Sequence, residues 1–170
     1  DWLDAYLGLV TRDRETAEQA ALALVSSSHT PPELTAFGAW TLALIGEWDR
    51  GTRILREQLA TIHRSPGWMH HALFLDHYQR QNYTAALAEA EKFNATGFFW
   101  DPLEKAAALG QLGEIDRGQE QLRQLVDLNP DFIRDPRRYL SCFIFTDELV
   151  NHVLDGLLKG GLSTQADGAD

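Results

Sequence analysis

Residues 113–130, GEIDRGQEQLRQLVDLNP, contain the pattern that decides the fold. A glycine opens the stretch, and apolar residues then recur at positions 122, 125, 126 and 128, a spacing that places them on one side of a helix. Asn129-Pro130 ends the stretch. Its first six residues, GEIDRG, nearly repeat the GEWDRG of residues 46–51, which lies 67 residues earlier. The chain therefore contains an internal repeat made of helices.

A third copy, QNYTAA at residues 81–86, lies halfway between the other two. In each copy a large apolar or aromatic residue is followed three positions later by a small one. The aligned residues are Trp48, Tyr83 and Ile115, at offsets of 35 and 32, and then Gly51, Ala86 and Gly118. A weaker copy precedes them, with Ala17, Ala21 and Leu24 in the equivalent places. A period of about 34 residues fits a pair of short helices and their turns.

Helix signals account for nearly the whole chain, and no stretch alternates with the period of a strand. Thr30-Pro31-Pro32-Glu33 and Asp101-Pro102-Leu103-Glu104 each predict an N-cap, an early proline and a capping-box glutamate. The spacing predicts an all-α chain with helices at about 2–10, 14–27, 33–45, 49–62, 67–79, 83–94, 102–111, 116–127, 136–143 and 147–159.

This period and turn signature resemble the tetratricopeptide repeat (TPR), in which each unit is a pair of antiparallel helices. The resemblance implies a right-handed superhelical solenoid with repeats at 1–31, 32–64, 65–98 and 99–132, capping helices at 133–162 and a disordered tail at 163–170. It also implies that a set of glycine, small and large positions packs the repeats together. These are Gly46, Trp48, Gly51, Tyr83, Ala86, Gly113, Ile115 and Gly118. Gln81 departs from the pattern, because the family has glycine there.

An ordered series of shorter motifs runs from about residue 32 to residue 162. It includes Ser65-Pro66-Gly67-Trp68, residues 77–83 (HYQRQNY), Asn129-Pro130-Asp131-Phe132 and residues 154–162 (LDGLLKGGL). The series resembles the C-terminal TPR region of bacterial adenylate cyclases and winged-helix transcriptional regulators. That resemblance implies a regulatory or sensory part of a larger signalling protein. A free-standing adaptor or chaperone that binds a separate protein is the alternative.

Composition excludes several classes of protein. The formal net charge of −10 argues against a nucleic-acid-binding face, and no apolar run is long enough to span a bilayer. A single cysteine, Cys142, rules out an internal disulfide and lies in an apolar stretch that predicts burial. No basic and apolar leader is visible. These features predict a cytoplasmic protein.

Catalytic and metal-binding patterns are weak. His70, His71, His77 and Asp76 share one predicted helix, but no two histidines have the four-residue spacing that zinc ligands on a helix adopt. The chain has neither a nucleophile elbow nor a Walker loop. We therefore expect no enzyme activity, no cofactor and no metal. An enzyme with a ligand near these histidines remains a third possibility.

In a stacked array the first helix of each unit lines the concave side. If the family's groove positions apply here, a set of mostly aromatic side chains forms a partner-binding groove: Tyr6, Trp40, Leu44, Trp68, His71 and Trp100. The expected partner is a protein or peptide, or an effector domain of the same chain, with no direct nucleic-acid or membrane contact. A homodimer through an exposed end helix is also expected to be possible, because repeat arrays have apolar ends.

Overall fold

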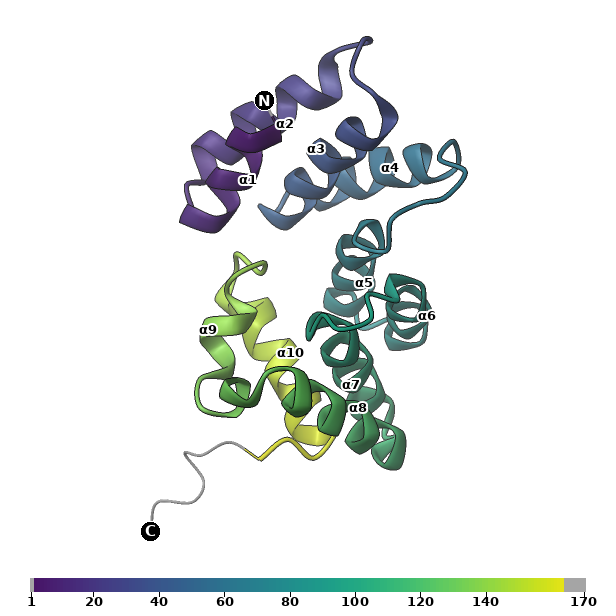
Figure 1. The fold of residues 1–170 in the computed structure, drawn as a ribbon, viewed down its shortest axis with the longest axis vertical. Coiled ribbons are helices and arrows are strands. Elements are labelled where there is room, and N and C mark those ends of the chain that lie inside the picture. Colours follow the sequence, from purple (N-terminus) through teal and green to yellow (C-terminus); the bar gives the residue numbers. More distant parts are fainter. Residues whose placement is uncertain (1, 164–170) are drawn as a thin grey trace.

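The computed structural model describes residues 2–163, which form ten α-helices and one 3-10 helix (Figure 1). The helices are α1 (Trp2–Thr11), α2 (Arg14–Ser26), α3 (Pro32–Leu44), α4 (Trp48–Leu59), α5 (Met69–Gln79), α6 (Tyr83–Phe93), α7 (Trp100–Leu112), α8 (Ile115–Leu128), η1 (Pro130–Ile133), α9 (Pro136–Leu140) and α10 (Asp147–Lys159). The all-α prediction is confirmed, and every predicted helix is present with ends within three residues of those expected. The 3-10 helix η1 was not predicted.

Each of the first four helix pairs turns through one residue with a positive φ angle. These residues are Arg12 (φ 57°), Gly46 (φ 107°), Gln81 (φ 60°) and Gly113 (φ 75°). Glycine adopts this conformation without strain, whereas Arg12 and Gln81 adopt it at some cost. The departure from the repeat pattern at Gln81 therefore changes the residue and keeps the turn.

Two predicted helix starts are wrong in detail. α3 begins after Pro31, with no side-chain cap, instead of being capped by Thr30. α7 begins at Trp100, one residue before the expected cap Asp101, whose carboxylate accepts hydrogen bonds from the Ala95 amide and the Lys105 ammonium. Tertiary packing of the aromatic residues at 99 and 100 extends this helix beyond its local signal.

Consecutive helices pack as hairpins, and the hairpins stack into a curved array (Figure 1). Small residues allow the helices to approach closely. A Cβ atom on Gly51 would lie 2.5 Å from the Ala43 backbone nitrogen, and one on Gly8 would lie 2.5 Å from that of Ala17. One continuous apolar core runs through the array from Leu9 to Leu162. The fold is an all-α solenoid.

The C-terminal segment lies on the inner side of the curve (Figure 1). α10 packs chiefly against α7, and it also reaches α5 and α6. The Tyr78 hydroxyl donates to the His152 carbonyl at 3.2 Å, and the Tyr83 hydroxyl lies 2.8 Å from His152 Nε2. A helix expected to cover the edge of the last repeat therefore also covers the inner face of two repeats.

Arg12 joins the two ends of the array. Its guanidinium donates to the carbonyls of Ser141, Ile144 at 3.3 Å and Phe145 at 3.1 Å, and it lies 5.0 Å from the centre of the Phe145 ring. Cys142, in the same loop, is exposed, so its predicted burial is wrong. The neighbouring Phe143 and Ile144 take the inward positions instead.

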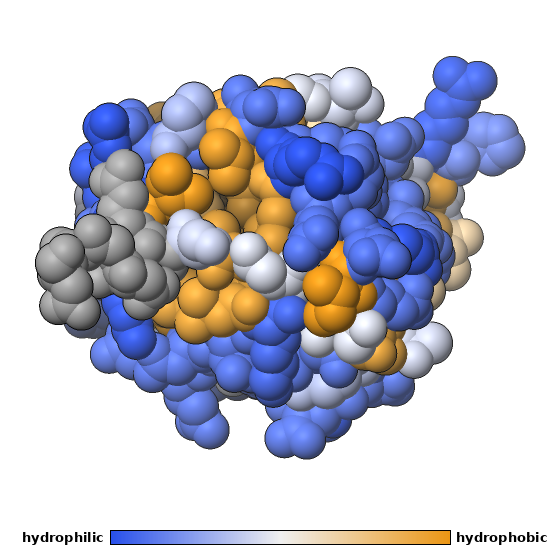
Figure 2. All heavy atoms as spheres, turned by 90° about the horizontal axis from the view of Figure 1, so that it is seen from below, coloured by the Kyte–Doolittle hydropathy of each residue, from blue (hydrophilic) through white to orange (hydrophobic). Residues whose placement is uncertain are grey.

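Figure 2 shows the end of the molecule near α8 and α10, where apolar side chains gather among hydrophilic ones. A hollow at this end is lined by Leu122, Val126, Ile133 and Leu162 together with several polar residues. The predicted disordered tail, beyond Ser163, lies outside the described residues.

Candidate functional site: an aromatic pocket on the inner face

A pocket of about 360 Å³ opens on the inner face of the array. It receives side chains from all four helix pairs and from the C-terminal segment. The lining residues are Trp2, Tyr6, Glu33, Leu34, Phe37, Trp40, Trp68, His71, Phe93, Phe98, Trp100 and Phe143. Its wall is almost wholly apolar. Trp40 and Trp100, which are 6% and 1% exposed, lie at the bottom of the pocket. Trp2 and Tyr6 are exposed at its rim.

Five of the six residues expected in the groove line this one pocket: Tyr6, Trp40, Trp68, His71 and Trp100. Leu44 does not. It is 1% exposed and belongs to the apolar core, because residues 38–44 of α3 are buried on every side. On α3, the groove predicted from the family therefore includes Trp40 but not Leu44.

Sequence reasoning missed seven lining residues. Phe37 precedes Trp40 by three residues, so helical spacing alone could have placed both on one face. Phe143 carried no such signal, because it comes from the loop after α9, outside the repeats. Only the folding back of the C-terminal segment brings it to the pocket. The others are Trp2, Glu33, Leu34, Phe93 and Phe98.

The aromatic rings of the pocket hold one another in place. The Trp40 ring centre lies 5.4 Å from that of Phe37, 5.7 Å from that of Trp68 and 5.9 Å from that of Phe143. Trp100 lies 6.0 Å from Phe143. These separations, and the edge-to-face arrangement of Trp40 with Trp68, are those that aromatic pairs prefer. The pocket is therefore a preformed shape with rigid walls.

A buried polar pair supports the floor of the pocket. His71 Nδ1 lies 2.5 Å from Glu104 Oε1, and the two side chains are 5% and 0% exposed. Burial raises the pKa of Glu104, and the hydrogen bond from His71 opposes that rise. The contact gives each of the two side chains a hydrogen-bond partner in a place where water cannot supply one.

Three ring nitrogens around the pocket have no hydrogen-bond partner among the described residues. They are Trp40 Nε1, Trp100 Nε1 and His71 Nε2, and each is covered by neighbouring atoms. The Glu104 Oε2 atom is likewise buried without a donor. Because the nitrogens are covered, the rings present carbon atoms to the pocket.

The other histidines of α5 point to separate partners. His70 Nδ1 lies 2.7 Å from the Glu89 carboxylate, which also accepts from Lys92 at 2.8 Å. Burial acts to raise the pKa of Glu89, but the hydrogen bonds from His70 and Lys92 outweigh it and lower this pKa to about 2. His70 and His71 therefore do not share a site. Within residues 2–163 no group of three or more potential metal ligands is present.

The lowered pKa of Glu89 predicts a dependence of stability on acid. Its carboxylate stabilises the fold above the usual pKa of 4.5, and this contribution is lost as pH falls toward about 2. We expect the difference in unfolding free energy between the wild type and Glu89→Gln to be largest above about pH 5 and to vanish near about pH 2. Urea unfolding at several pH values measures it.

Glu91→Gln is the control for this prediction. Glu91 lies on the same helix, is exposed and contacts only Arg117, at 3.8 Å, among the ion pairs of the described residues. A difference for Glu89→Gln that stays constant over the acid range would contradict the assigned role of Glu89.

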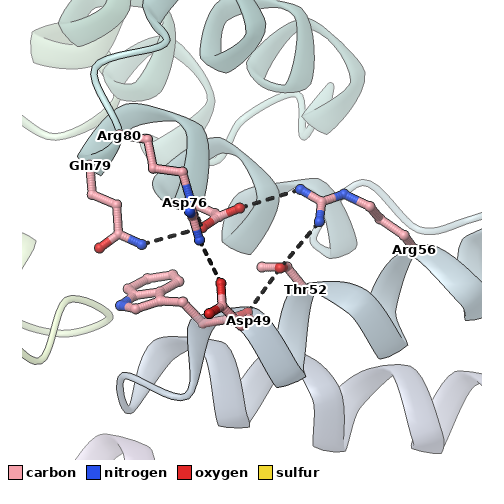
Figure 3. A network of polar contacts seen from close by, with 7 residues as sticks. Asp49, Thr52, Arg56, Asp76, Gln79 and Arg80 are labelled. Atoms are coloured by element: carbon pink, nitrogen blue, oxygen red, sulfur yellow. Dashed lines mark hydrogen bonds and ion pairs between the residues drawn. The ribbon is translucent and has the colours of Figure 1, made fainter.

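A second polar cluster connects α4 to α5 (Figure 3). The buried Asp76 carboxylate accepts from Arg56 at 3.3 Å and from Arg80 at 2.9 Å, and Arg80 also donates to Asp49 at 2.8 Å. Arg56 donates to the Thr52 hydroxyl at 3.2 Å. The cluster neutralises a buried carboxylate and fixes neighbouring repeats, which is a structural role.

The residues expected to pack the repeats take several environments. Ala86 is fully buried, Gly51 and Gly118 are buried in their helices, and Trp48 and Tyr83 pack partly buried against the core. Gly46 and Gly113 form the turns described above. Ile115 is 38% exposed, because it is the first residue of α8.

Paired helices with small residues at their contacts, stacked around an aromatic inner face, define an all-α helical solenoid. The fold is similar to that of a solved structure of MamA from AMB-1. The TM-score is 0.61, and the match covers 98% of this chain and 90% of that chain. The sequence identity is 17%, so the likeness concerns the fold alone. No family model matches the chain, and no curated protein matches its sequence.

Among the helices of residues 2–163, none has both the length and the apolar character needed to cross a membrane.

Proposed function

We propose that this chain is a non-catalytic, TPR-type module for protein–protein interaction. One observation carries the proposal: α1 exposes a row of large apolar side chains. Each is between 40% and 47% exposed, and together they are Trp2, Leu3, Tyr6, Leu7 and Val10. Their spacing places them along one side of the helix. A contiguous exposed apolar surface of this kind marks a site of protein contact.

The row lies at the N-terminal end of the array, where a repeat protein needs an element to cover its first unit. Trp2 and Tyr6 also reach the rim of the pocket, so a protein seated on α1 touches both surfaces. An effector domain of the same chain suits this position. The proposed context is the regulatory part of a cytoplasmic bacterial signalling protein, a cyclase or a transcriptional regulator, which the motifs between residues 32 and 162 support. A free-standing adaptor is the alternative, and a homodimer through α1 is a further possibility.

Leu7→Glu tests the role of α1. Leu7 is 45% exposed, so the substitution leaves the core intact and places a charge within the apolar row. We expect at least a ten-fold loss of binding, because burying an unpaired charge costs more than about 1.4 kcal/mol. Light scattering measures self-association, and affinity capture from the source cells measures binding of a partner.

Leu128→Glu is the matched control, because Leu128 is also 45% exposed but lies at the end of α8. The proposal requires binding to be lost with Leu7→Glu and kept with Leu128→Glu. Equal behaviour of the two variants would contradict it. An immunoblot of the source cells separates the two contexts, since a fused effector domain would give a band well above 19.1 kDa.

A further inference from the structure

The pocket is an aromatic cage with a negative charge at its edge. Nine of its twelve lining residues are aromatic, one is the carboxylate Glu33, and none is a lysine or an arginine. The faces of aromatic rings carry negative electrostatic potential, which attracts a cation placed over them. The histidine of the wall, His71, lies with its Nδ1 atom 2.5 Å from the buried Glu104 carboxyl group. The electrostatic character of the cavity therefore favours a positive ligand.

The buried rings in the deep part of the cavity offer such a ligand no hydrogen bonds, whereas Glu33 and Tyr6 are at the exposed rim. The nitrogen atoms of Trp40, Trp100 and His71 are covered, so ring carbons form the surface. A primary ammonium has three N–H donors, and against these buried rings it would lose its hydrogen bonds to water without replacement. A quaternary ammonium has no N–H donor, and its methyl groups are apolar. Its positive charge matches the negative potential of the ring faces, and its methyl groups match the apolar wall of the cage.

We propose that the pocket binds the quaternary ammonium group of a small molecule such as choline. The cavity volume of about 360 Å³ is at the low end of the range for small-molecule sites. Glu33 lies exposed at the mouth, and the formal net charge of −10 attracts cations to the protein. This inference goes beyond the proposed function, because the ligand is a small molecule and the site lies deeper than the row on α1.

The C-terminal segment completes the cage. The Phe143 ring centre lies 5.9 Å from that of Trp40, 6.0 Å from that of Trp100 and 6.1 Å from that of His71. The loop that carries Phe143 is tied to the first helix hairpin by Arg12. The ligand is thus held between the helix pairs and the returning end of the chain, which favours a compact molecule over an extended peptide.

Tryptophan fluorescence reports directly on this site. Four of the five tryptophans line the cavity, and only Trp48 lies outside it. The decisive titration compares choline with 3,3-dimethyl-1-butanol, which has the same shape but a neutral carbon in place of the nitrogen. We expect choline to bind about ten-fold more tightly, because only the cation gains from the ring faces and from Glu33.

Two variants and one control locate the site. Trp68→Leu removes a half-buried cage ring, and Glu33→Gln removes the charge at the mouth. Both are expected to weaken choline binding several-fold while they leave binding of the neutral alcohol little changed. Trp48→Leu, outside the cage, is expected to leave both affinities unchanged. Circular dichroism checks that each variant folds. If Trp68→Leu does not fold, Glu33→Gln alone tests the proposal, because Glu33 is exposed and its substitution leaves the core intact.

Three results would overturn the proposal. The first is that the neutral alcohol binds as tightly as choline, which would make the pocket a purely apolar one. The second is that neither compound changes the fluorescence. The third is that a trimethyllysine peptide binds and choline does not, which would mean that the ammonium group belongs to a protein ligand. Each result is independent of the Leu7→Glu comparison, so failure of the cage leaves the role of α1 to be judged separately.

Discussion

Gly110→Ala is expected to lower the free energy of unfolding by about 3 kcal/mol, because it forces apart two helices that touch backbone to backbone. A Cβ atom at this position of α7 would lie 1.9 Å from the Gly156 carbonyl oxygen and 2.7 Å from the Gly160 nitrogen. Neither neighbour is a flexible side chain that could move away. Urea unfolding followed by far-UV circular dichroism measures the loss.

Gly118→Ala is the matched control, since Gly118 is also a buried helical glycine that faces Gly160. There the added Cβ would lie 3.6 Å from the nearest atom, the Gly160 Cα, which is an ordinary contact. Because alanine favours the helix over glycine, we expect this variant to be neutral or more stable by up to about 1 kcal/mol. Equal losses for the two variants would contradict the close packing of α10 on α7.

The buried pair beneath the pocket supports a second large effect. His71→Leu leaves the fully buried Glu104 without its hydrogen bond and is expected to cost about 3–5 kcal/mol. Glu104→Met leaves His71 Nδ1 without a partner and is expected to cost about 1–3 kcal/mol. The double variant replaces both polar groups with apolar ones and should cost less than His71→Leu alone.

A double-mutant cycle by denaturant unfolding measures this coupling. We expect the cost of the double variant to be lower than the sum of the single costs by at least about 2 kcal/mol. Simple additivity would mean that the two residues do not interact. Phe143 packs against His71 from another part of the chain. Because it is the same in all four proteins of the cycle, its contribution cancels from the coupling energy.

The helices could be predicted because their signals are local. Periodic apolar residues, early prolines and the glycines at 46 and 113 act over one or two turns of chain, and each helix formed where they indicated. Glu104 shows the limit of such reasoning. Its local sequence predicts a capping-box residue, but it lies buried against His71, which is 33 residues away. Only the stacking of two repeats brings that partner to it.

The site could be predicted in part for the same reason. Trp68 and Trp100 occupy equivalent places at the starts of α5 and α7, and Trp40 and His71 lie further along the first helices of their repeats, so helical and repeat spacing together place them on one face. The enclosure of the pocket could not be predicted. Phe143 closes it through contacts that depend on α10 lying along α7, and no periodic pattern links residues 133–162 to the inner face.

The contact between Arg12 and the loop at 141–145 changes how the molecule should unfold. In an open repeat array each unit touches only its neighbours, so end units can melt while the middle stays folded. Here the first hairpin is bound to a loop about 130 residues further along the chain. Loss of either end therefore weakens the other, and the array should unfold in one cooperative transition. The same distant contact forms late, because closing a long loop has a large entropic cost, so the cage is expected to be complete only in the last step of folding.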